Sequence, residues 1–453
     1  MGEDTYGTPT AMGLGIETLL SIFESHSCDQ IFIKALAPND NSKNQIYLAP
    51  NPDQLRSIPR ADWNVHELTS RKPNASNKKI LRANVPFNWL LPDGGIAPAP
   101  SSNLIFYPQY PEVRFSGFLK GSAVNASQWM QPQKQGRSDG RYLIWGVSPA
   151  RGSFAYLAVP NSQISKALSL RADQEGFQAI GDPKSGLTAN GFNKRKDVRS
   201  EIIQTVAMIY DKNPHAGSIL KNGQVFPNTA PNAGGTTLES LFGIEPNGSA
   251  APDYFGWELK GHSKNVVTML TPEPDGGFYK EVGATKFTRR YGYPDRRGRI
   301  GRLNFGGIHK VGALNPLTSL ELKLFGHEDP EEGSFNIDGY LGLIDINGNI
   351  AASWSFTKLL NHWQTKHANT VFVGFKRSGN SFHFAHEIYM GEGTSFSNLL
   401  RGFSNQAIYY DPGIKVEQRE GKSRTKARSQ FRVNKKNLAP LFDSFTHVDV
   451  LRP

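Results

Sequence analysis

The sequence predicts two domains, a mainly-β first domain and an α/β second domain. Its 453 residues suffice for two or three domains of about 150 residues each. Short segments rich in β-branched and aromatic residues fill residues 1–181, whereas helical and strand patterns alternate over residues 194–453. Between them, residues 182–193 (DPKSGLTANGFN) are polar and contain Pro and Gly, which indicates a linker.

The expected strands of the first domain are short and bounded by Pro, Asn, Gly and Ser. They lie at residues 30–36, 45–48, 104–106, 112–119, 141–146 and 154–159. Residues 51–82 and 94–103 are expected to be loops. Short strands joined by long polar loops are typical of a small barrel or sandwich.

The second domain mixes helices with strands. Residues 195–210 have helical periodicity, with the apolar residues Val198, Ile202, Ile203, Val206 and Ile209 on one face. Further helices are expected from about residue 237 and at 355–364, and strands at 254–260, 266–270, 320–325, 339–344 and 370–374. This mixture predicts an α/β domain.

The composition excludes several classes of protein. The chain has 51 Lys and Arg against 40 Asp and Glu, and a net charge of +11 favours a polyanionic partner, nucleic acid or an acidic membrane surface. A single cysteine, Cys28, excludes an intrachain disulfide framework and a Cys-rich zinc site. No apolar run reaches the ~18 residues of a membrane span, and Glu17 interrupts the apolar stretch 11–23, which no basic residue precedes. We therefore expect a cytoplasmic protein without a membrane partner.

Two runs of the second domain concentrate the basic residues. Residues 286–302 hold seven Lys and Arg against Asp295, and residues 415–436 hold nine against two acidic residues. A basic run is commonly just a solvated face. Aromatic residues beside both runs favour the other interpretation, binding to nucleic-acid phosphates.

The chemistry concentrates in residues 251–262, APDYFGWELKGH. Alternation along a strand puts Glu258 and Lys260 on one face, and a turn can bring Asp253 to the same end. Two carboxylates there form a hard-oxygen site for Mg²⁺, and the lysine can orient an attacking water. The pattern by itself is weak, because an ordinary salt bridge on a surface strand has the same spacing.

A third acidic residue precedes this segment. Residues 234–241 (GGTTLESL) are typical of a helix start, with a Thr available as cap and Glu239 in the first turn. Glu239 lies about one short helix before Asp253.

Together, Glu239, Asp253, Glu258 and Lys260 resemble the active site of the MvaI/BcnI family of type II restriction endonucleases, relatives of the MutH nicking enzyme. Further shared elements are RYG (290–292), WSF (354–356), LRG (400–402) and FRV (431–433), so the resemblance covers residues 193–453. It implies a restriction-endonuclease-like, MutH-like nuclease domain of the PD-(D/E)xK class. It also implies Mg²⁺ held by Asp253, Glu258 and the main-chain carbonyl of Leu259, with Lys260 aligning the water and Glu239 supporting a second metal or a water.

The resemblance implies DNA contacts in the second domain. The expected residues are His262, Arg289, Arg290, Tyr291, Arg296, Arg297, Asp411, Lys415, Arg424, Lys426, Arg428 and Arg432. Arg and Lys suit guanine, and Asp411 matches an Asp that reads cytosine, but the Arg that follows it in the family is Gly413 here, and the family's His-rich HxHG segment is absent. Alternatives stay open: His262 as a structural histidine, and the run 422–436 as a phosphate binder only.

The first domain has a second resemblance, to the effector domain of EcoRII, a DNA-binding pseudobarrel. It rests on residues 31–40 (IFIKALAPND) and 44–48 (NQIYL). It implies that two arms grip the major groove, one with Lys34, Asn39, Asp40, Asn41, Lys43 and Gln45, the other with Gln109, Glu112 and Arg114. The alternative is a polar turn at 39–41 and a surface cation at Arg114.

These features predict a sequence-specific, Mg²⁺-dependent endonuclease that hydrolyses phosphodiester bonds of double-stranded DNA. We expect a monomeric type IIE enzyme whose first domain binds a second copy of the site as an allosteric effector, and whose genetic partner is a cognate DNA methyltransferase. Two alternatives remain, a MutH-like nicking or modification-dependent nuclease and a non-catalytic DNA-binding protein.

Overall fold

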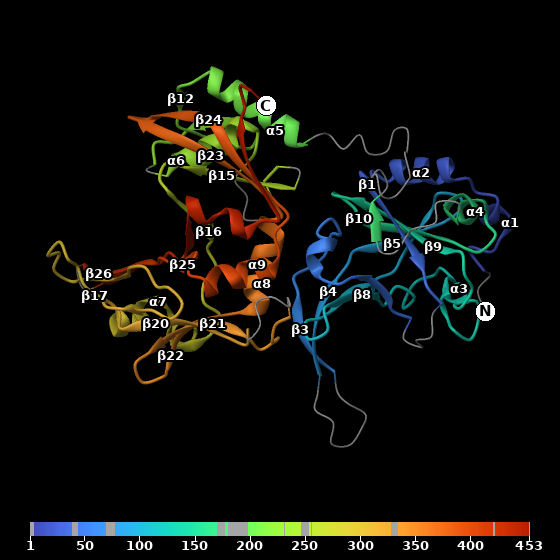
Figure 1. Cartoon of the computed structure of the whole chain (residues 1–453), viewed down its shortest axis with the longest axis horizontal. Helices are drawn as coiled ribbons and strands as arrows, with labels where there is room; N and C mark the ends of the chain where they lie inside the picture. Colours follow the sequence, from blue (N-terminus) through green and yellow to red (C-terminus); the bar gives the residue numbers. More distant parts are fainter. Residues whose placement is uncertain are drawn as a thin grey trace. The chain divides into compact units, whose positions relative to one another are not determined.

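The computed structural model describes residues 4–38, 44–68, 78–169, 177–179, 198–230, 232–245, 253–254, 256–327, 334–419 and 422–452. The chain divides into two units, Met1–Asp197 and Val198–Pro453, referred to as the first and second unit (Figure 1). The expected linker at 182–193 lies outside the described residues.

The first unit is built mainly of strands. They are β1 (Gln30–Leu36), β2 (Ile46–Ala49), β3 (Asn64–Leu68), β4 (Lys78–Asn84), β5 (Phe87–Leu90), β6 (Ile96–Pro98), β7 (Asn103–Tyr107), β8 (Glu112–Ser116), β9 (Arg141–Ser148), β10 (Gly152–Ala158) and β11 (Phe177–Ala179). They form two sheets, ordered β11-β1-β9-β10-β5-β6 and β2-β8-β7-β4-β3. The helices are α1 (Pro9–Met12), α2 (Ile16–Ser25), η1 (Pro52–Leu55), α3 (Ser127–Met130) and α4 (Gln163–Ser169).

Aromatic side chains join the two sheets of the first unit. Phe115 of β8 lies 4.7 Å from Trp145 of β9 and 4.9 Å from Phe87 of β5, measured between ring centroids. All three side chains are buried, and their apolar area is a major source of stability for this unit.

Several expectations for the first unit are wrong. The segment 51–82, expected to be a loop, contains β3 and the start of β4, and β6 lies within 94–103. The side chains of β3 do not alternate between buried and exposed: the first four residues are exposed, and Leu68 is half-buried. Its strand conformation therefore comes from pairing with β4. The helix α2 spans most of the apolar stretch 11–23, and it buries Leu19, Leu20 and Phe23.

The second unit mixes helices with several sheets. The helices are α5 (Val198–Asp211), α6 (Ala233–Leu241), α7 (Gly277–Tyr291), α8 (Phe356–Lys366), α9 (Phe396–Ser404), η3 (Lys435–Asn437) and η4 (Ala439–Leu441). The strands are β12 (His215–Ala216), β13 (Ser218–Lys221), β14 (Gln224–Pro227), β15 (Trp257–His262), β16 (Val266–Leu270), β17 (Tyr293–Pro294), β18 (Arg302–Gly306), β19 (Leu314–Asn315), β20 (Leu320–Phe325), β21 (Tyr340–Asp345), β22 (Ile350–Ser355), β23 (Asn369–Ser378), β24 (Ser381–Glu392), β25 (Ile408–Tyr410), β26 (Gly413–Arg419), β27 (Lys422–Lys426), β28 (Phe431–Asn434) and β29 (Ser444–Asp449). The expected α/β domain is confirmed in its mixture of elements.

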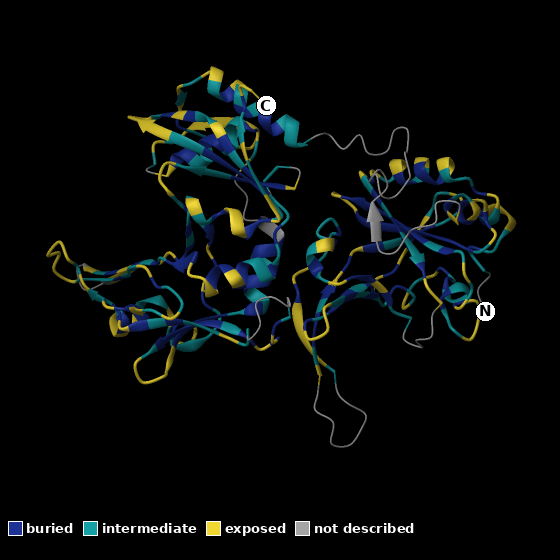
Figure 2. Cartoon of the chain, viewed as in Figure 1, coloured by how far each residue is buried: buried dark blue, intermediate teal, exposed yellow. Residues whose placement is uncertain are grey.

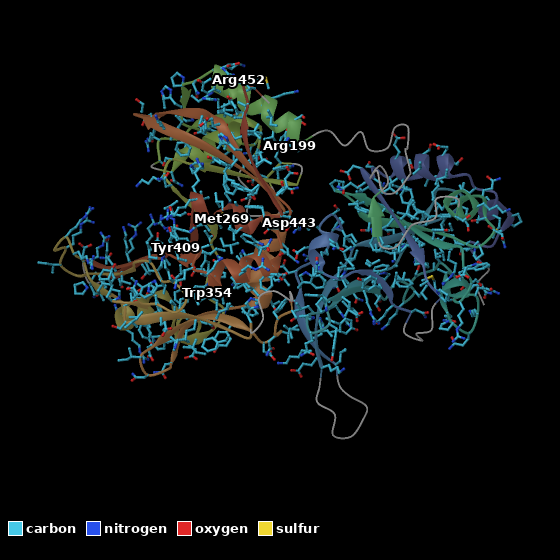
Figure 3. The ribbon with its side chains drawn as sticks, in the orientation of Figure 1. Arg199, Met269, Trp354, Tyr409, Asp443 and Arg452 are labelled. Atoms are coloured by element: carbon cyan, nitrogen blue, oxygen red, sulfur yellow. The ribbon has the colours of Figure 1, made fainter. Side chains whose placement is uncertain are left out.

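One sheet of this unit carries the chemistry-bearing segment. Its order is β12-β24-β23-β15, and β29 pairs with the same edge of β24 as β12, further along the strand. The apolar faces of α5 and α6 pack on it in one buried core that includes Val206, Leu238, Leu259 and Val373 (Figure 2). Arg199 of α5 (labelled in Figure 3) also reaches β24, with its Nε 3.2 Å from Glu392.

The start of α6 differs from the expectation. The helix begins at Ala233, four residues before the expected start, and its N-cap Asn232 makes no side-chain cap. Thr236 and Thr237 lie inside the helix and donate their hydroxyls to the Ala233 carbonyl at 3.0 and 2.7 Å. Glu239 is consequently near the end of α6 rather than in its first turn.

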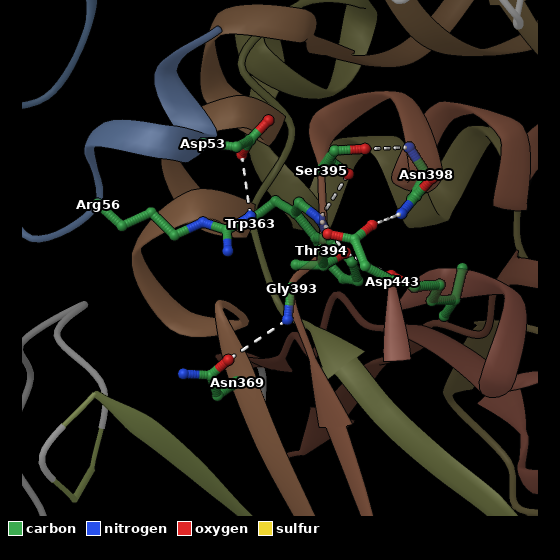
Figure 4. A network of polar contacts seen from close by, with 10 residues as sticks. Asp53, Arg56, Trp363, Asn369, Gly393, Thr394, Ser395, Asn398 and Asp443 are labelled. Atoms are coloured by element: carbon green, nitrogen blue, oxygen red, sulfur yellow. Dashed lines mark hydrogen bonds and ion pairs between the residues drawn. The ribbon is translucent and has the colours of Figure 1, made fainter. Parts of the chain in front are cut away.

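The remaining sheets are ordered β16-β28-β25, β17-β18-β26-β27, β19-β20-β21-β22 and β13-β14. Trp354 of β22 packs 4.7 Å from Tyr410 and 5.0 Å from Phe431, ring to ring, and so joins two of them. A polar network fixes the turn between β24 and α9: Trp363 donates its indole N–H to Thr394 at 3.2 Å, and Asn398 donates to Asp443 at 3.4 Å (Figure 4).

Among the described residues, no helix is both long and apolar enough to cross a membrane.

Candidate active site

The strand β15 forms the edge of its sheet. It runs parallel to β23, with Glu258 opposite Thr370 and Lys260 opposite Phe372. Side chains alternate, so Glu258, Lys260 and His262 share one face, while Trp257 and Leu259 enter the core under α5 and α6. The expected arrangement of Glu258 and Lys260 on one strand face is therefore present.

Glu258 is a buried carboxylate. Its side chain is 3% exposed, and the Lys260 ammonium forms an ion pair with its Oε1. Burial of a carboxylate is costly unless a charge or a metal compensates it. The Lys260 ammonium therefore stabilises the negative charge of the buried Glu258 carboxylate.

The tripeptide Glu-Leu-Lys of β15 also occurs in β20, and the two copies can be compared. Glu321-Leu322-Lys323 of β20 also pairs its carboxylate with its lysine, at 3.1 Å, but Glu321 is 30% exposed. Its strand lies inside a sheet, between β19 and β21, and no Asp side chain accepts from Leu322 in the described part of the chain. Only the copy in β15 combines burial with a free sheet edge.

Asp253 lies at this free edge. Its Oδ2 accepts a hydrogen bond from the Leu259 N–H at 3.0 Å. The N–H and C=O of one strand residue point to the same side, so the Leu259 carbonyl also points to the free edge, beside Asp253. The two carboxylates and this carbonyl are the three expected metal ligands.

This set of donors fits Mg²⁺. All three groups supply hard oxygen atoms, and Mg²⁺ commonly takes one or two carboxylates and completes its shell with water and phosphate oxygens. The hydroxyl of Thr370, opposite Glu258, is buried and has no hydrogen-bond partner in the described part of the chain, so it can receive a metal-bound water. The described residues contain no group of three or more His, Cys, Asp or Glu side chains spaced for a metal.

Glu239 is not brought into a cluster with the other two acids. It belongs to α6, which packs on the face of β15 opposite to Lys260: a Cβ added at Gly261 would lie 3.5 Å from the Gly235 Cα. Any part played by Glu239 must therefore be exerted around the edge of β15.

His262 ends the face of β15 that carries Glu258 and Lys260. The ring is half-buried, and its Nε2 has no hydrogen-bond partner within the described part of the chain. Burial, followed by the nearby Lys435 charge, lowers the pKa of His262 to about 4. The ring is therefore neutral at pH 7.

The sheet β17-β18-β26-β27 has one basic face. Lys415 pairs with Lys426, and Arg424 with Glu417, across β26 and β27; both lysines and Arg424 are exposed. The opposite face buries Ile414 and Val416. Arg296 and Arg297 are exposed in the turn between β17 and β18, where Arg296 lies 5.6 Å from the Tyr293 ring.

The RYG residues lie at the end of α7. Arg289 and Arg290 are exposed, and the Arg290 guanidinium lies 4.8 Å from the Phe278 ring and 4.0 Å from Asp345. Tyr291 is largely buried and donates its hydroxyl to Asp345 at 3.3 Å. Its surroundings favour a packing role over a DNA contact.

At Gly413, where the family has an Arg, the side chain of Arg428 occupies the neighbouring space. A Cβ added at Gly413 would lie 3.1 Å from the Arg428 guanidinium, and the Gly413 N–H donates to the Arg428 carbonyl at 2.9 Å. Nearby, Asp411 accepts from Arg432 at 2.6 Å. Arg428 thus occupies the space over Gly413, whereas Asp411 and Arg432 are paired with each other.

In the first unit, β2 and β8 bring three expected residues together. Arg114 donates to Gln45 at 3.2 Å and to Glu112 at 3.0 Å. Lys34 of β1 lies 5.7 Å from the ring of Tyr47, and Tyr47 is the residue of β2 opposite Arg114. Gln109 is exposed in the turn before β8, and Asn39, Asp40, Asn41 and Lys43 lie outside the described residues.

Sequence reasoning missed some residues of these surfaces. Tyr47 and Tyr107 lie against Lys34 and Arg114, at 5.7 Å in both pairs. Lys376 and His383 are neighbours across β23 and β24, and no local pattern links them to β15. Lys264 follows the motif by two residues and could have been found from its position alone.

Comparison with known proteins gives one family match. The model of the MvaI/BcnI restriction endonuclease family matches residues 203–442. Among solved structures, restriction endonuclease MvaI with its cognate DNA substrate matches with a TM-score of 0.43 and 17% identity, over 56% of this chain and 99% of that chain. The structure of MvaI in the absence of DNA matches with a TM-score of 0.31 and 16% identity, over 56% and 98%. No curated protein matches this chain.

Proposed function

The chain belongs to the MvaI/BcnI restriction endonuclease family, and from this membership we propose that it is a Mg²⁺-dependent type II endonuclease that hydrolyses both strands of double-stranded DNA at a specific site. Two observations carry the proposal: Asp253 accepts a hydrogen bond from the Leu259 N–H at the free edge of β15, and Glu258 forms a buried ion pair with Lys260 on the same strand. Family membership supports the reaction class, and this arrangement supports its location.

Each of these residues has a separate part in the reaction. Asp253, Glu258 and the Leu259 carbonyl would hold Mg²⁺, which when bound stabilises the charge that develops on the scissile phosphate and the leaving oxygen. Lys260 points its ammonium along the same strand face and orients the attacking water. Glu239 of α6 would support a second metal or a water, and it could do so only around the edge of β15. No covalent intermediate on the protein is required.

We assign the reading of bases to the sheet that carries Arg424 and Arg428. Their guanidinium groups can donate two hydrogen bonds to guanine in the major groove, while Arg289, Arg296, Arg297, Lys415 and Lys426 bind phosphates. The position of Arg428 over Gly413 supports its part in base recognition, because the glycine leaves room for a planar guanidinium.

We further propose that the first unit binds a second copy of the DNA site and activates cleavage, as in type IIE enzymes. Arg114, Gln45 and Glu112 form a polar group at the edge of a strand pair, and such groups can read base edges. The enzyme would act as a monomer, and a methyltransferase for the same site would protect the host DNA.

Incubation with supercoiled plasmid and Mg²⁺ tests the proposal. Linear DNA with discrete fragment ends is expected, and sequencing these ends identifies the site. Open-circular product alone would instead indicate a nicking nuclease. A mobility shift without cleavage would indicate a DNA-binding protein and would contradict the proposed reaction.

A further inference from the structure

A cavity of about 390 Å³ opens beside the end of the catalytic strand. Its walls come from two places in the chain, the end of β15 with the turn that follows it and the hairpin of β23 and β24. The polar side chains that line it are His262, Ser263, Lys264, Asn265, Lys376 and His383.

The hollow depends on a missing side chain. Gly374 lies opposite His262 in the ladder between β15 and β23. A Cβ there would lie 3.6 Å from the His262 ring and 3.6 Å from the Ala385 side chain, so any longer side chain would fill the space between them.

The cavity is electropositive. Lys264 and Lys376 line it, Lys435 is close enough for its charge to lower the pKa of His262, and no Asp or Glu is among the lining residues. Among the described residues, none of these three lysines has an ion-pair partner; Lys435 lies 4.4 Å from the Tyr389 ring. Uncompensated positive charge around a hollow attracts an anion.

The cavity also contains an unsatisfied polar atom. The Nε2 of His262 is buried and has no hydrogen-bond partner among the residues that the structure describes, while the ring is hydrogen-bonded to the main chain of Lys264. A buried polar atom without a partner is costly and is commonly explained by a ligand. A phosphate oxygen at this place would provide the partner, because its charge favours a proton on Nε2.

We propose that this cavity binds a second backbone phosphate of the DNA, within one or two nucleotides of the phosphate that is cut. His262 lies two residues beyond Lys260 on the same strand face, a distance of roughly 7 Å. Successive nucleotides of one strand rise by about 3.4 Å along the duplex, so a neighbouring phosphate falls within reach. The proposal rests on the proposed nuclease function and assigns Lys264, Lys376 and His383 to the DNA site.

Position-specific removal of phosphate charge tests this assignment. The probe is a duplex with the cleaved sequence, bound in the presence of EDTA, in which single phosphates near the cut are replaced by neutral methylphosphonates. We expect one flanking replacement to weaken binding by the wild-type protein about tenfold. Lys264→Gln and Lys376→Gln should weaken binding of the unmodified duplex, and the same replacement should then cost little more, because it removes the charge that the lost lysine contacted.

A control separates local binding from general charge. Lys212→Gln removes an exposed lysine next to the end of α5 and should keep the wild-type profile. Gly374→Leu keeps every charge but fills the hollow, and it should reproduce the loss at the same phosphate. Lysine variants with the wild-type profile, or equal losses at every phosphate, would overturn the proposal. A wild-type protein that cuts no DNA would contradict the proposed function instead.

Discussion

At the scale of single residues, the surroundings of Glu258, rather than its Glu-Leu-Lys tripeptide, distinguish the proposed active site. The tripeptide Glu-Leu-Lys occurs in both β15 and β20, so the tripeptide alone could not have singled out the proposed site. The longer segment from Asp253 to His262 could, because it adds the second carboxylate. What the sequence could not show is that β15 is an edge strand, which leaves the Leu259 N–H free for Asp253.

Glu258→Gln should reduce cleavage by at least about a hundredfold, because a neutral amide is a poor ligand for Mg²⁺. DNA binding without metal should survive or become tighter, because a negative charge near the phosphate is lost. Plasmid cleavage and binding in EDTA measure the two effects. Glu321→Gln is the matched control, and cleavage by Glu258→Gln within tenfold of wild type would show that the site is assigned wrongly.

His309 gives a prediction about pH. Its ring is fully buried, with Nδ1 3.0 Å from the Gly307 carbonyl and Nε2 2.8 Å from the Thr318 hydroxyl. Burial is the main cause that lowers the pKa of His309 to about 4. The neutral His309 ring contributes fully to stability above about pH 6.5, the pKa of histidine in the unfolded chain. This contribution is lost as the pH falls from there towards 4, because over this range only the unfolded chain takes up the proton.

Urea unfolding at pH 7.5 and 5.5 measures this effect. His309 should account for a loss of about 1 kcal/mol in the free energy of unfolding between the two pH values. His309→Gln, which keeps a polar side chain, should show a smaller loss; carboxylates common to both proteins cancel in the comparison. Equal pH dependence of the two proteins would contradict a neutral buried His309.

At the scale of elements, hydrophobic periodicity predicted the helices and strands that bury one face. The helix α5 and the strands β16 and β20 lie within a few residues of their expected positions. The helix α7 was missed because it holds few apolar residues, and because Gly283, with φ of 75°, breaks its regular geometry in the middle. Lys286, Arg289 and Arg290 belong to the basic run 286–302, for which no helix was predicted, and they lie on the last turns of α7.

Two arginines at the sheet β17-β18-β26-β27 should affect different properties of DNA binding, one the affinity and the other the sequence preference. Arg297→Gln should weaken binding to all duplexes alike and reduce the salt slope by about 0.9, because it removes one phosphate contact. Arg428→Gln should instead reduce discrimination against mismatched sites by roughly 1–3 kcal/mol. Competition binding with matched and mismatched duplexes at several salt concentrations tests both. Equal losses on both duplexes for both variants would refute this division of roles.

At the scale of the whole molecule, each unit has a core of its own. The second unit buries Ile202, Leu238, Trp257, Val371 and Ile388 around one sheet, without residues of the first unit in that cluster. A unit of this size can support an independent core. The change in sequence pattern near residue 190 predicts a domain boundary, and the two compact units divide at residue 197. The pairing of Arg114 with Gln45 depends on strand register, which the sequence does not reveal.

Deletion of residues 1–197 should therefore leave a folded nuclease that no longer responds to a second DNA site. If the first unit restrains cleavage until it binds DNA, its removal abolishes the restraint, and a coupling of roughly 1–3 kcal/mol corresponds to a ~5–150-fold effect on the response. Plasmids with one and with two sites, each with and without a short duplex that carries the site, measure this response. The intact protein should prefer two sites or be stimulated by the duplex, and Arg114→Gln should reduce that stimulation without affecting Mg²⁺-dependent cleavage itself. An intact protein that cuts both plasmids equally would show that the first unit adds affinity or specificity but no allosteric control.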